Sequence, residues 1–289
     1  MTRPYSICIY GYPAPLEEIR WSLEMITFGL ERGFRALPHV NVRGCLNVNH
    51  AGTGEIPPCD FLIIHACLGD FHLDFQALRA TVGKTVLVLE YPSPLVDHNF
   101  CFREDSRTGI KGRTTILRPC LKDFLVNEPK DDKLVLLDHN WPPRGGQDFS
   151  AWLYPALEPL LDEGYRFIQL GGEARELLAP PWVTRIPVLP YPEYLAATAR
   201  VGTFIPTHSG SYNHSLIDMF ARGTRVLVRG SMHLPPDMVR DIRLPVFRSG
   251  DELRDLIRQP IDHAGWDRKI DLCTDMKDVV GVMDAWMTA

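Results

Sequence analysis

The chain lacks the marks of a membrane-spanning or disulfide-rich secreted protein. None of its apolar runs approaches the roughly 20 residues that a transmembrane helix needs. Its first residues lead into a short strand-like run rather than a signal peptide. The seven cysteines are odd in number, widely spaced and never arranged as C-x-x-C, which is typical of reduced thiols. We therefore expect a cytoplasmic protein without a membrane span.

Several catalytic signatures are also missing. The sequence has no G-x-x-x-x-G-K-[ST] phosphate loop, no G-x-G-x-x-G after the first predicted strand and no G-x-S-x-G elbow. It has neither H-E-x-x-H nor a Cys/His cluster with metal-ligand spacing, so we expect no built-in metal or cofactor. The net charge of −5, from 31 basic and 36 acidic residues, excludes an overall basic field for nucleic acid.

Alternating strand and helix patterns run through the 289 residues, which are more than one domain usually holds. Short apolar runs predict strands at 6–10, 40–46, 61–65, 85–89, 133–137, 166–170, 185–189, 202–205, 225–228 and 245–247. Strands separated by helices pair in parallel, because each connection crosses over the sheet. The fold class predicted is α/β with two Rossmann-like domains.

The polar segment 123–132 is the best domain boundary. We assign residues 1–125 to an acceptor-binding domain and 133–289 to a second domain. The sequence leaves open whether the C-terminal helix packs back on the first domain. An apolar stripe predicts a helix over 16–30 that is closed by Gly33. Ser249 and Glu252 have the spacing of a capping box at a later helix start.

The most informative segment is 204–228, which has a strand, a loop of small polar residues, a helix, a glycine and another strand. A helix that is preceded by Ser209, Gly210 and Ser211 offers the unpaired amides of its first turn to an anion. Asp218 lies inside this helix, where its carboxylate can meet a ligand hydroxyl. An ordinary capped crossover helix with a surface aspartate explains the same pattern.

This segment resembles the nucleotide-binding region of GT-B glycosyltransferases, in which an acid stands five positions before a glycine. Here the acid is Asp218 and the glycine is Gly223. The resemblance implies that Asp218 holds the ribose hydroxyls of a nucleotide sugar and that the preceding loop receives its diphosphate. The loop residues implied as donor-binding are Ser209, Gly210, Ser211, Tyr212 and Asn213.

Other segments of 133–258 follow the order of that family. Arg144 in the turn after 133–137 looks like its phosphate ligand. Gly171 and Gly172 resemble the glycine end of its second strand, and Leu189 and Tyr191 resemble the residues that flank the nucleotide base. The resemblance implies two sheets facing a central cleft and a nucleotide-diphosphate sugar, first a UDP-sugar, as donor.

The sequence departs from the family at two points. Many retaining members carry a pair of glutamates, and the first would fall at Gly210. Arg144 also lacks a lysine in the same turn. These departures put the retaining subclass and the charge compensation of the diphosphate in question.

An inverting transfer needs a base near the acceptor hydroxyl, and we expect it at a strand end of the first domain. The candidates are Asp70, Asp97, His98 and His65, although each histidine is also explained as a structural residue. Gly11 and Tyr12, after the first strand, would let an acceptor approach the backbone closely, and a tight turn explains them equally well.

The segment 103–122 holds six basic and two acidic side chains. Arg107, Lys111 and Arg113 are candidates to bind an anionic acceptor, including a DNA backbone. A solvated loop is the commoner explanation, and regular aromatic residues for base stacking are lacking.

These observations predict a metal-independent glycosyltransferase that acts on a hydroxyl of a glycan, a small molecule or a modified DNA base. The alternatives are a sugar-nucleotide epimerase or hydrolase of the same fold, and a non-catalytic protein that binds a nucleotide or a partner. The sequence leaves the oligomeric state open.

Overall fold

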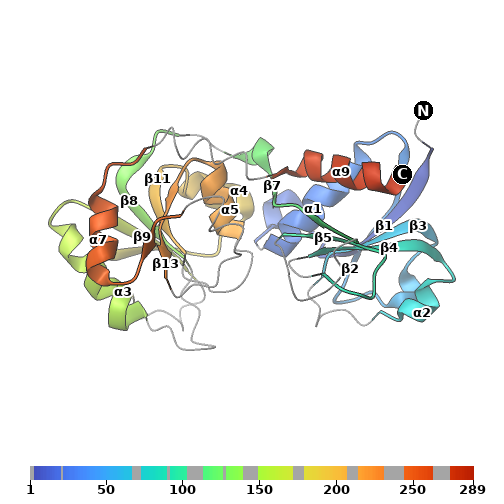
Figure 1. Ribbon diagram of the computed structural model, residues 1–289, viewed down its shortest axis with the longest axis horizontal. Helices are drawn as coiled ribbons and strands as arrows, with labels where there is room; N and C mark the ends of the chain where they lie inside the picture. Colours follow the sequence, from blue (N-terminus) through green and yellow to red (C-terminus); the bar gives the residue numbers. More distant parts are fainter. Residues whose placement is uncertain are drawn as a thin grey trace. The chain divides into compact units, whose positions relative to one another are not determined.

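The structure is a computed structural model, and it divides into two compact units (Figure 1). It describes residues 3–20, 22–66, 73–89, 92–102, 113–125, 128–138, 149–171, 179–206, 214–230, 244–262 and 274–289. Unit 1 comprises Met1–Lys122 and Thr274–Ala289, and unit 2 comprises Asp123–Cys273. The boundary after Lys122 lies three residues before position 125, where we expected the first domain to end. The last segment, Thr274–Ala289, belongs to unit 1.

Unit 1 is built on a six-stranded parallel sheet with the order β2-β1-β3-β4-β5-β6. Its strands are β1 (Tyr5–Gly11), β2 (Val40–Asn47), β3 (Cys59–Ile64), β4 (Val82–Leu89), β5 (His98–Cys101) and β6 (Thr114–Ile116). The first four cover the predicted runs, except that β3 ends one residue before the predicted end at 65. The sequence did not predict β5 and β6, which are short and begin with polar residues.

Helix α1 (Ser22–Arg35) follows β1, and the 3-10 turn η1 (Leu16–Glu18) precedes it. The single helix predicted over 16–30 is therefore wrong at both ends. Gly33 lies inside α1, where a Cβ would stand 2.6 Å from Val280 Cγ2 of the C-terminal helix. Gly29, one turn earlier, would meet Met276 Cγ at 2.6 Å. Both glycines thus allow a close helix–helix approach.

The C-terminal helix α9 (Met276–Thr288) lies along α1 in unit 1 (Figure 1). Short strands β15 (Thr274–Asp275) and β7 (Pro119–Cys120) pair just before it. Asp284 Oδ1 accepts a hydrogen bond of 2.7 Å from the Tyr5 hydroxyl and lies 2.8 Å from His39 Nε2. The Trp286 ring stacks on His98 at 4.7 Å between centroids. Residues 274–289 thereby complete the core of unit 1.

Further short helices in the described part of unit 1 are η2 (Thr53–Glu55) and α2 (Phe75–Leu78), and η4 (Lys122–Phe124) lies at the passage to unit 2. Asp74 caps α2, since its Oδ1 accepts from the amides of Gln76 and Ala77. No helix among the described residues is long and apolar enough to cross a bilayer.

Unit 2 is built on a five-stranded parallel sheet with the order β10-β9-β8-β11-β12. Its strands are β8 (Asp131–Leu137), β9 (Arg166–Leu170), β10 (Val183–Ile186), β11 (Val201–Ile205) and β12 (Arg225–Val226). Beyond β12, β13 (Val228–Arg229) pairs in parallel with β14 (Val246–Phe247). The predicted strand at 185–189 lies two to three residues earlier in the structure.

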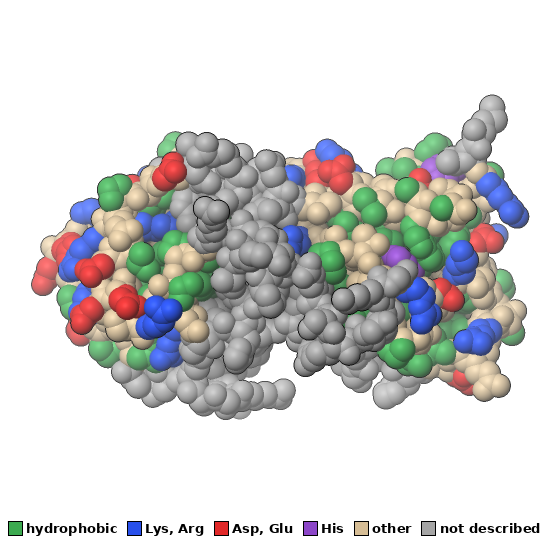
Figure 2. All heavy atoms as spheres, in the orientation of Figure 1, with side chains coloured by type: hydrophobic (Ala, Val, Ile, Leu, Met, Phe, Trp, Pro, Cys, Tyr) green, Lys and Arg blue, Asp and Glu red, His purple; other side chains and the backbone are tan. Residues whose placement is uncertain are grey.

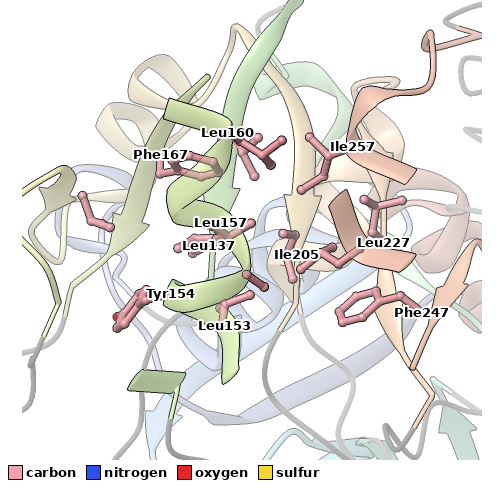
Figure 3. Packing of buried hydrophobic residues seen from close by; sticks show 14 residues of the cluster. Leu137, Leu153, Tyr154, Leu157, Leu160, Phe167, Ile205, Leu227, Phe247 and Ile257 are labelled. Atoms are coloured by element: carbon pink, nitrogen blue, oxygen red, sulfur yellow. The ribbon is translucent and has the colours of Figure 1, made fainter. Parts of the chain in front are cut away.

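The helical segments among the described residues of unit 2 are α3 (Phe149–Leu157), η5 (Glu158–Leu161), α4 (Tyr191–Ala197), α5 (His214–Ala221) and α7 (Gly250–Arg258). Leu153 and Leu157 of α3 pack toward Ile205, Leu227 and Ile257 in one buried cluster (Figure 3). Burial of these aliphatic side chains attaches α3 and α7 to one face of the sheet.

Two of these helices have the capping residues that the sequence indicates, α5 at its end and α7 at its start. Gly223, two residues after the end of α5, adopts a positive φ of 68°, and the Thr224 amide donates to Met219 O, as in a glycine-terminated helix. Ser249 Oγ accepts from the Glu252 amide at 3.2 Å, which confirms half of the expected capping box. Glu252 instead accepts from the amide of Arg248.

Candidate functional site

Each sheet has a point at which its strand order reverses, and ligands of open parallel sheets bind outside the carboxyl ends of the strands there. In unit 1 this point lies between β1 and β3, which are the neighbours from which the chain winds outward in both directions. In unit 2 it lies between β8 and β11. The candidate residues are therefore located relative to these two edges.

In unit 2, Asp218 and Tyr191 form a buried hydrogen-bonded pair. The Tyr191 hydroxyl, at the start of α4, donates to Asp218 Oδ1 on α5 across 3.0 Å. Asp218 is 1% exposed and Tyr191 is 7% exposed. Because α4 and α5 both begin near the carboxyl edge of the sheet, the pair lies close to the edge where β8 and β11 end.

Arg222, one turn after Asp218, links α5 to the end of α4. Its guanidinium donates to Leu195 O at 2.9 Å and to Thr198 Oγ1 at 2.8 Å. The side chain is 2% exposed. Among the described side chains, no ion pair joins Arg222 to the Asp218 carboxylate, since its donors are directed to main-chain and hydroxyl oxygens. Arg222 therefore fixes the two helices together without neutralising Asp218 directly.

Burial raises the pKa of Asp218 to about 7, while the charge of Arg222 and the hydrogen bond from Tyr191 oppose the rise. Burial also raises the pKa of the Tyr191 phenol, and the nearby Asp218 carboxylate adds to that rise. A carboxyl group with such a pKa changes its charge near neutral pH. Strongly shifted carboxyl groups of this kind are enriched at functional sites.

Asp138 is a residue at this edge that the sequence analysis missed. It follows β8 directly and is 2% exposed, and its amide donates to Ile205 O of β11 at 3.2 Å. Gln169 Nε2 donates to Asp138 O at 3.3 Å, and the Tyr154 hydroxyl donates to Gln169 Oε1 at 2.8 Å. A carboxylate immediately after the apolar run 133–137 was the signal that could have found it.

Gly171 and Leu189 lie at the same end of unit 2 in different surroundings. Gly171 ends β9, and its amide donates to Ile186 O at 2.6 Å. A Cβ there would stand 2.9 Å from that oxygen, so the glycine allows the ends of β9 and β10 to approach. Leu189 is half-buried in the segment between β10 and α4.

In unit 1, Gly11, Tyr12 and His65 lie together where β1 and β3 end. The His65 amide donates to Tyr10 O at 2.8 Å, and the Tyr12 amide donates to Thr27 Oγ1 at 3.0 Å. A Cβ on Gly11 would stand 2.6 Å from Thr27 Oγ1 and 3.2 Å from His65 O. The structure thus requires a glycine here, and it brings together three of the residues expected on the acceptor side.

His65 is a fully buried neutral histidine. Its Nδ1 lies 2.6 Å from Val88 O, and a carbonyl can only accept, so Nδ1 carries the proton. Burial lowers the pKa of His65 to about 4, and the main-chain groups of Val88 and Leu23 oppose this shift. The ring is therefore uncharged at neutral pH, and its low pKa makes it a weak general base.

Asp97 and His98 are not at the carboxyl edge where we expected a base. His98 begins β5 and pairs with Val86 in the middle of β4, so Asp97 lies toward the amino ends of these strands. Asp97 Oδ2 accepts from the Thr85 amide and hydroxyl at 2.7 and 3.0 Å. Arg113 is exposed just before β6, on the same amino side. The expected position was wrong because the sequence did not reveal β5.

The other sequence candidates fall outside the described residues. These are Asp70, Arg144, Gly172, Ser209, Gly210, Ser211, Tyr212, Asn213, Arg107 and Lys111. Within the described part of the chain, no group of three or more His, Cys, Asp or Glu side chains is arranged to hold a metal ion.

No protein-family model matches the chain, and no curated protein matches its sequence significantly. Solved structures match over its whole length. A glycosyltransferase from Rickettsia africae ESF-5 gives a TM-score of 0.65 at 10% identity and covers 98% of each chain. UDP-GlcNAc 2-epimerase from Neisseria meningitidis, bound to UDP-GlcNAc, gives 0.62 at 9% identity and covers 96% of this chain and 98% of its own.

MnaA from S. aureus in complex with UDP gives a TM-score of 0.62 at 12% identity and covers 99% of this chain and 97% of its own. At such identities the likeness establishes the fold and leaves the reaction to be argued from residues. Two parallel α/β units in tandem, matched over nearly the full length of these structures, confirm the fold class predicted: the chain has the GT-B fold.

Proposed function

We propose that the chain is a glycosyltransferase that moves a sugar from a nucleotide-diphosphate sugar to a hydroxyl acceptor without a metal ion. The observation that carries the proposal is the buried Asp218 carboxyl group, held by Tyr191 beside the carboxyl edge of a parallel sheet. The glycosyltransferase fold of structures similar over the whole chain supports it. Unit 2 would hold the donor, and unit 1 the acceptor.

Asp218 would bind the ribose of the donor. Tyr191 occupies one oxygen of the carboxyl group, Oδ1, and fixes its plane. The second oxygen is then the acceptor for a ribose hydroxyl. Two of the similar structures contain UDP or UDP-GlcNAc, so a UDP-sugar is the first donor to test. Residues 209–213 and Arg144 remain proposed ligands of the diphosphate.

Transfer requires a stabilised leaving diphosphate and a base for the acceptor hydroxyl. Cationic and amide donors at the diphosphate would stabilise the charge that develops as the sugar–oxygen bond breaks. Of the four base candidates, Asp70 is retained. Asp97 and His98 lie toward the other edge of the sheet, and the His65 ring is a weak base because its pKa is about 4. Gly11 and Tyr12 would line the acceptor side.

A small hydroxyl compound or a glycan fits the described surface better than DNA. On the face shown in Figure 2, basic and acidic side chains of the described residues are interspersed, and no large basic patch stands out there. Arg113, on the amino side of the sheet, is remote from the carboxyl ends of β1 and β3. An extended phosphate backbone would need a continuous row of cations.

A sugar-nucleotide epimerase is the second candidate, because UDP-GlcNAc 2-epimerase, with a TM-score of 0.62, is about as similar in fold as the Rickettsia glycosyltransferase, with 0.65. The two reactions differ in whether an acceptor is needed. Incubation with UDP-GlcNAc alone, followed by chromatography of the sugar nucleotides, separates them. Conversion without acceptor would replace the transferase proposal by the epimerase or hydrolase alternative.

The donor site is tested by thermal unfolding in the presence of UDP-, GDP-, ADP-, CDP- and TDP-sugars. A ligand that binds the folded state raises the unfolding midpoint. We expect a selective rise that Asp218→Asn abolishes and that Asp162→Asn, an exposed aspartate of the same unit, retains. No rise with any donor, or an equal rise in Asp218→Asn, would contradict the proposal.

A further inference from the structure

Arg229 lies beside the carboxyl end of the unit 2 sheet. The Leu227 amide donates to Phe204 O at 3.0 Å, so β13 continues past the end of β11. Gly230, the next residue, donates to Phe247 O of β14 at 2.8 Å and fixes the strand there. Arg229 therefore stands beside the carboxyl end of β11.

Trp152 of α3 holds the Arg229 side chain. The guanidinium carbon lies 4.1 Å from the centroid of the Trp152 ring. That ring lies 6.1 Å from the Phe247 ring and packs on the buried cluster of Figure 3. A guanidinium on an indole face is attracted to the ring and keeps its N–H groups free at its edges. Because Trp152 lies on α3, the next described helix after β8, the contact joins Arg229 to the helix that packs on this face of the sheet.

No described acidic side chain pairs with the charge of Arg229. Arg166 pairs with Asp131, and Arg258 pairs with Glu163. Arg222 and Arg225 direct their donors to internal oxygens. Within the described part of the chain, the Arg229 side chain has no hydrogen bond or ion pair, and its only described partner is the Trp152 ring. A half-buried guanidinium with free donors at a strand end is suited to an anion.

We propose that Arg229, oriented by Trp152, binds the diphosphate of the donor. This inference rests on the proposed nucleotide-sugar function and supplies a second cation, since Arg144 has no lysine in its own turn. A guanidinium contacts phosphate oxygens through two parallel N–H donors, and it stabilises the charge of the departing diphosphate.

Calorimetric titration with UDP and with uridine tests the inference, because only UDP carries the diphosphate. In Arg229→Gln the dissociation constant for UDP is expected to rise by about tenfold or more, and that for uridine to stay within about twofold. Arg166→Gln is the matched control, since it removes the same charge at the amino end of β9 in the same sheet. It is expected to bind both ligands like the wild type.

The possible outcomes distinguish a failure of the Arg229 inference from a failure of the donor site. If the wild type binds UDP and Arg229→Gln binds it equally well, the inference is wrong and the donor site stands. If Arg229→Gln weakens uridine as much as UDP, Arg229 acts on the fold and the inference is again wrong. If the wild type does not bind UDP, the titrations are repeated with GDP, ADP, CDP and TDP and with their nucleosides. A wild type that binds none of the five overturns the donor proposal and this inference together.

The role of Trp152 is tested by UDP binding of single and double variants. Trp152→Leu is expected to weaken UDP binding less than Arg229→Gln does, and to have no further effect in the Arg229→Gln background. Additive losses would show that Trp152 does not act through Arg229. Unfolding midpoints of the ligand-free variants are measured alongside, so that a loss of folded protein is recognised.

Discussion

Tyr191 donates its phenolic proton to Oδ1 of Asp218 across 3.0 Å, inside the contact between α4 and α5. The two residues stand 27 positions apart in the chain, and both side chains are buried. Tyr191 was expected beside the nucleotide base, whereas its hydroxyl is directed at the carboxyl group expected to bind the ribose. The tyrosine thus positions Asp218.

Tyr191→Phe removes only this hydroxyl. The dissociation constant for UDP is expected to rise about fivefold at pH 7, because Asp218 loses the donor that fixes its plane and opposes the rise in its pKa. Calorimetric titration measures this change. Tyr165→Phe is the control, since it removes a hydroxyl that donates to Ile257 O elsewhere in unit 2. Equal losses in both variants would mean that the effect is a general one on stability.

Asp218 makes the stability of the protein fall as the pH rises. Its pKa is raised to about 7 in the folded state from 3.8, so the folded protein binds the proton more tightly than the unfolded chain. This contribution is complete below about pH 4 and is lost as the pH rises through 7. Relative to Asp218→Asn, the wild type should lose up to about 4 kcal/mol between these limits, as measured by urea unfolding. A constant difference would contradict the buried carboxyl group.

His65 has the opposite dependence. Its pKa falls from 6.5 to about 4 on folding, so its contribution is complete above about pH 6.5 and is lost as the pH falls toward 4. The expected loss is about 3 kcal/mol. The stability difference between the wild type and His65→Gln should shrink by that amount, whereas His50→Gln, at an exposed histidine, should show no such trend. A trend equal in both variants would argue against burial of His65.

Trp286 fastens the C-terminal helix to unit 1. Its ring stacks on His98 and meets Phe61 and Phe100 edge-on. Trp286→Ala should therefore lower the free energy of unfolding by about 3 kcal/mol. Val282→Ala on the same helix, where the side chain is 41% exposed, should cost about 0.5 kcal/mol or less. Similar costs would mean that α9 does not depend on this contact.

Local patterns predicted the strands of both sheets wherever a run of apolar residues was long enough. They failed at β5, whose His98 and Asn99 are buried polar residues in a four-residue strand. Asn99 is satisfied there by the Ser93 backbone, and His98 by Thr115 and Trp286. Because these partners come from other elements, a period-2 pattern does not reveal the strand. Asp97 and His98 were consequently assigned to the wrong edge of the sheet.

Long-range contacts decide the rest of the candidate site. Asp218 was identified from its place before Gly223, but its bond to Tyr191 depends on α4 and α5 lying side by side. Asp138 was missed although it follows an apolar run directly. The return of α9 rests on Tyr5 and Asp284, which are 279 positions apart. Nothing in the local sequence around either residue indicates that contact.

The position of UDP in a crystal of its complex with the protein tests the account most directly. We predict the ribose hydroxyls within hydrogen-bond distance of the Asp218 carboxyl group, with Tyr191 still bonded to Oδ1. The diphosphate should lie at the carboxyl ends of β8 and β11. A ribose bound away from Asp218, or a nucleotide seated only on unit 1, would contradict the assignment of the donor site.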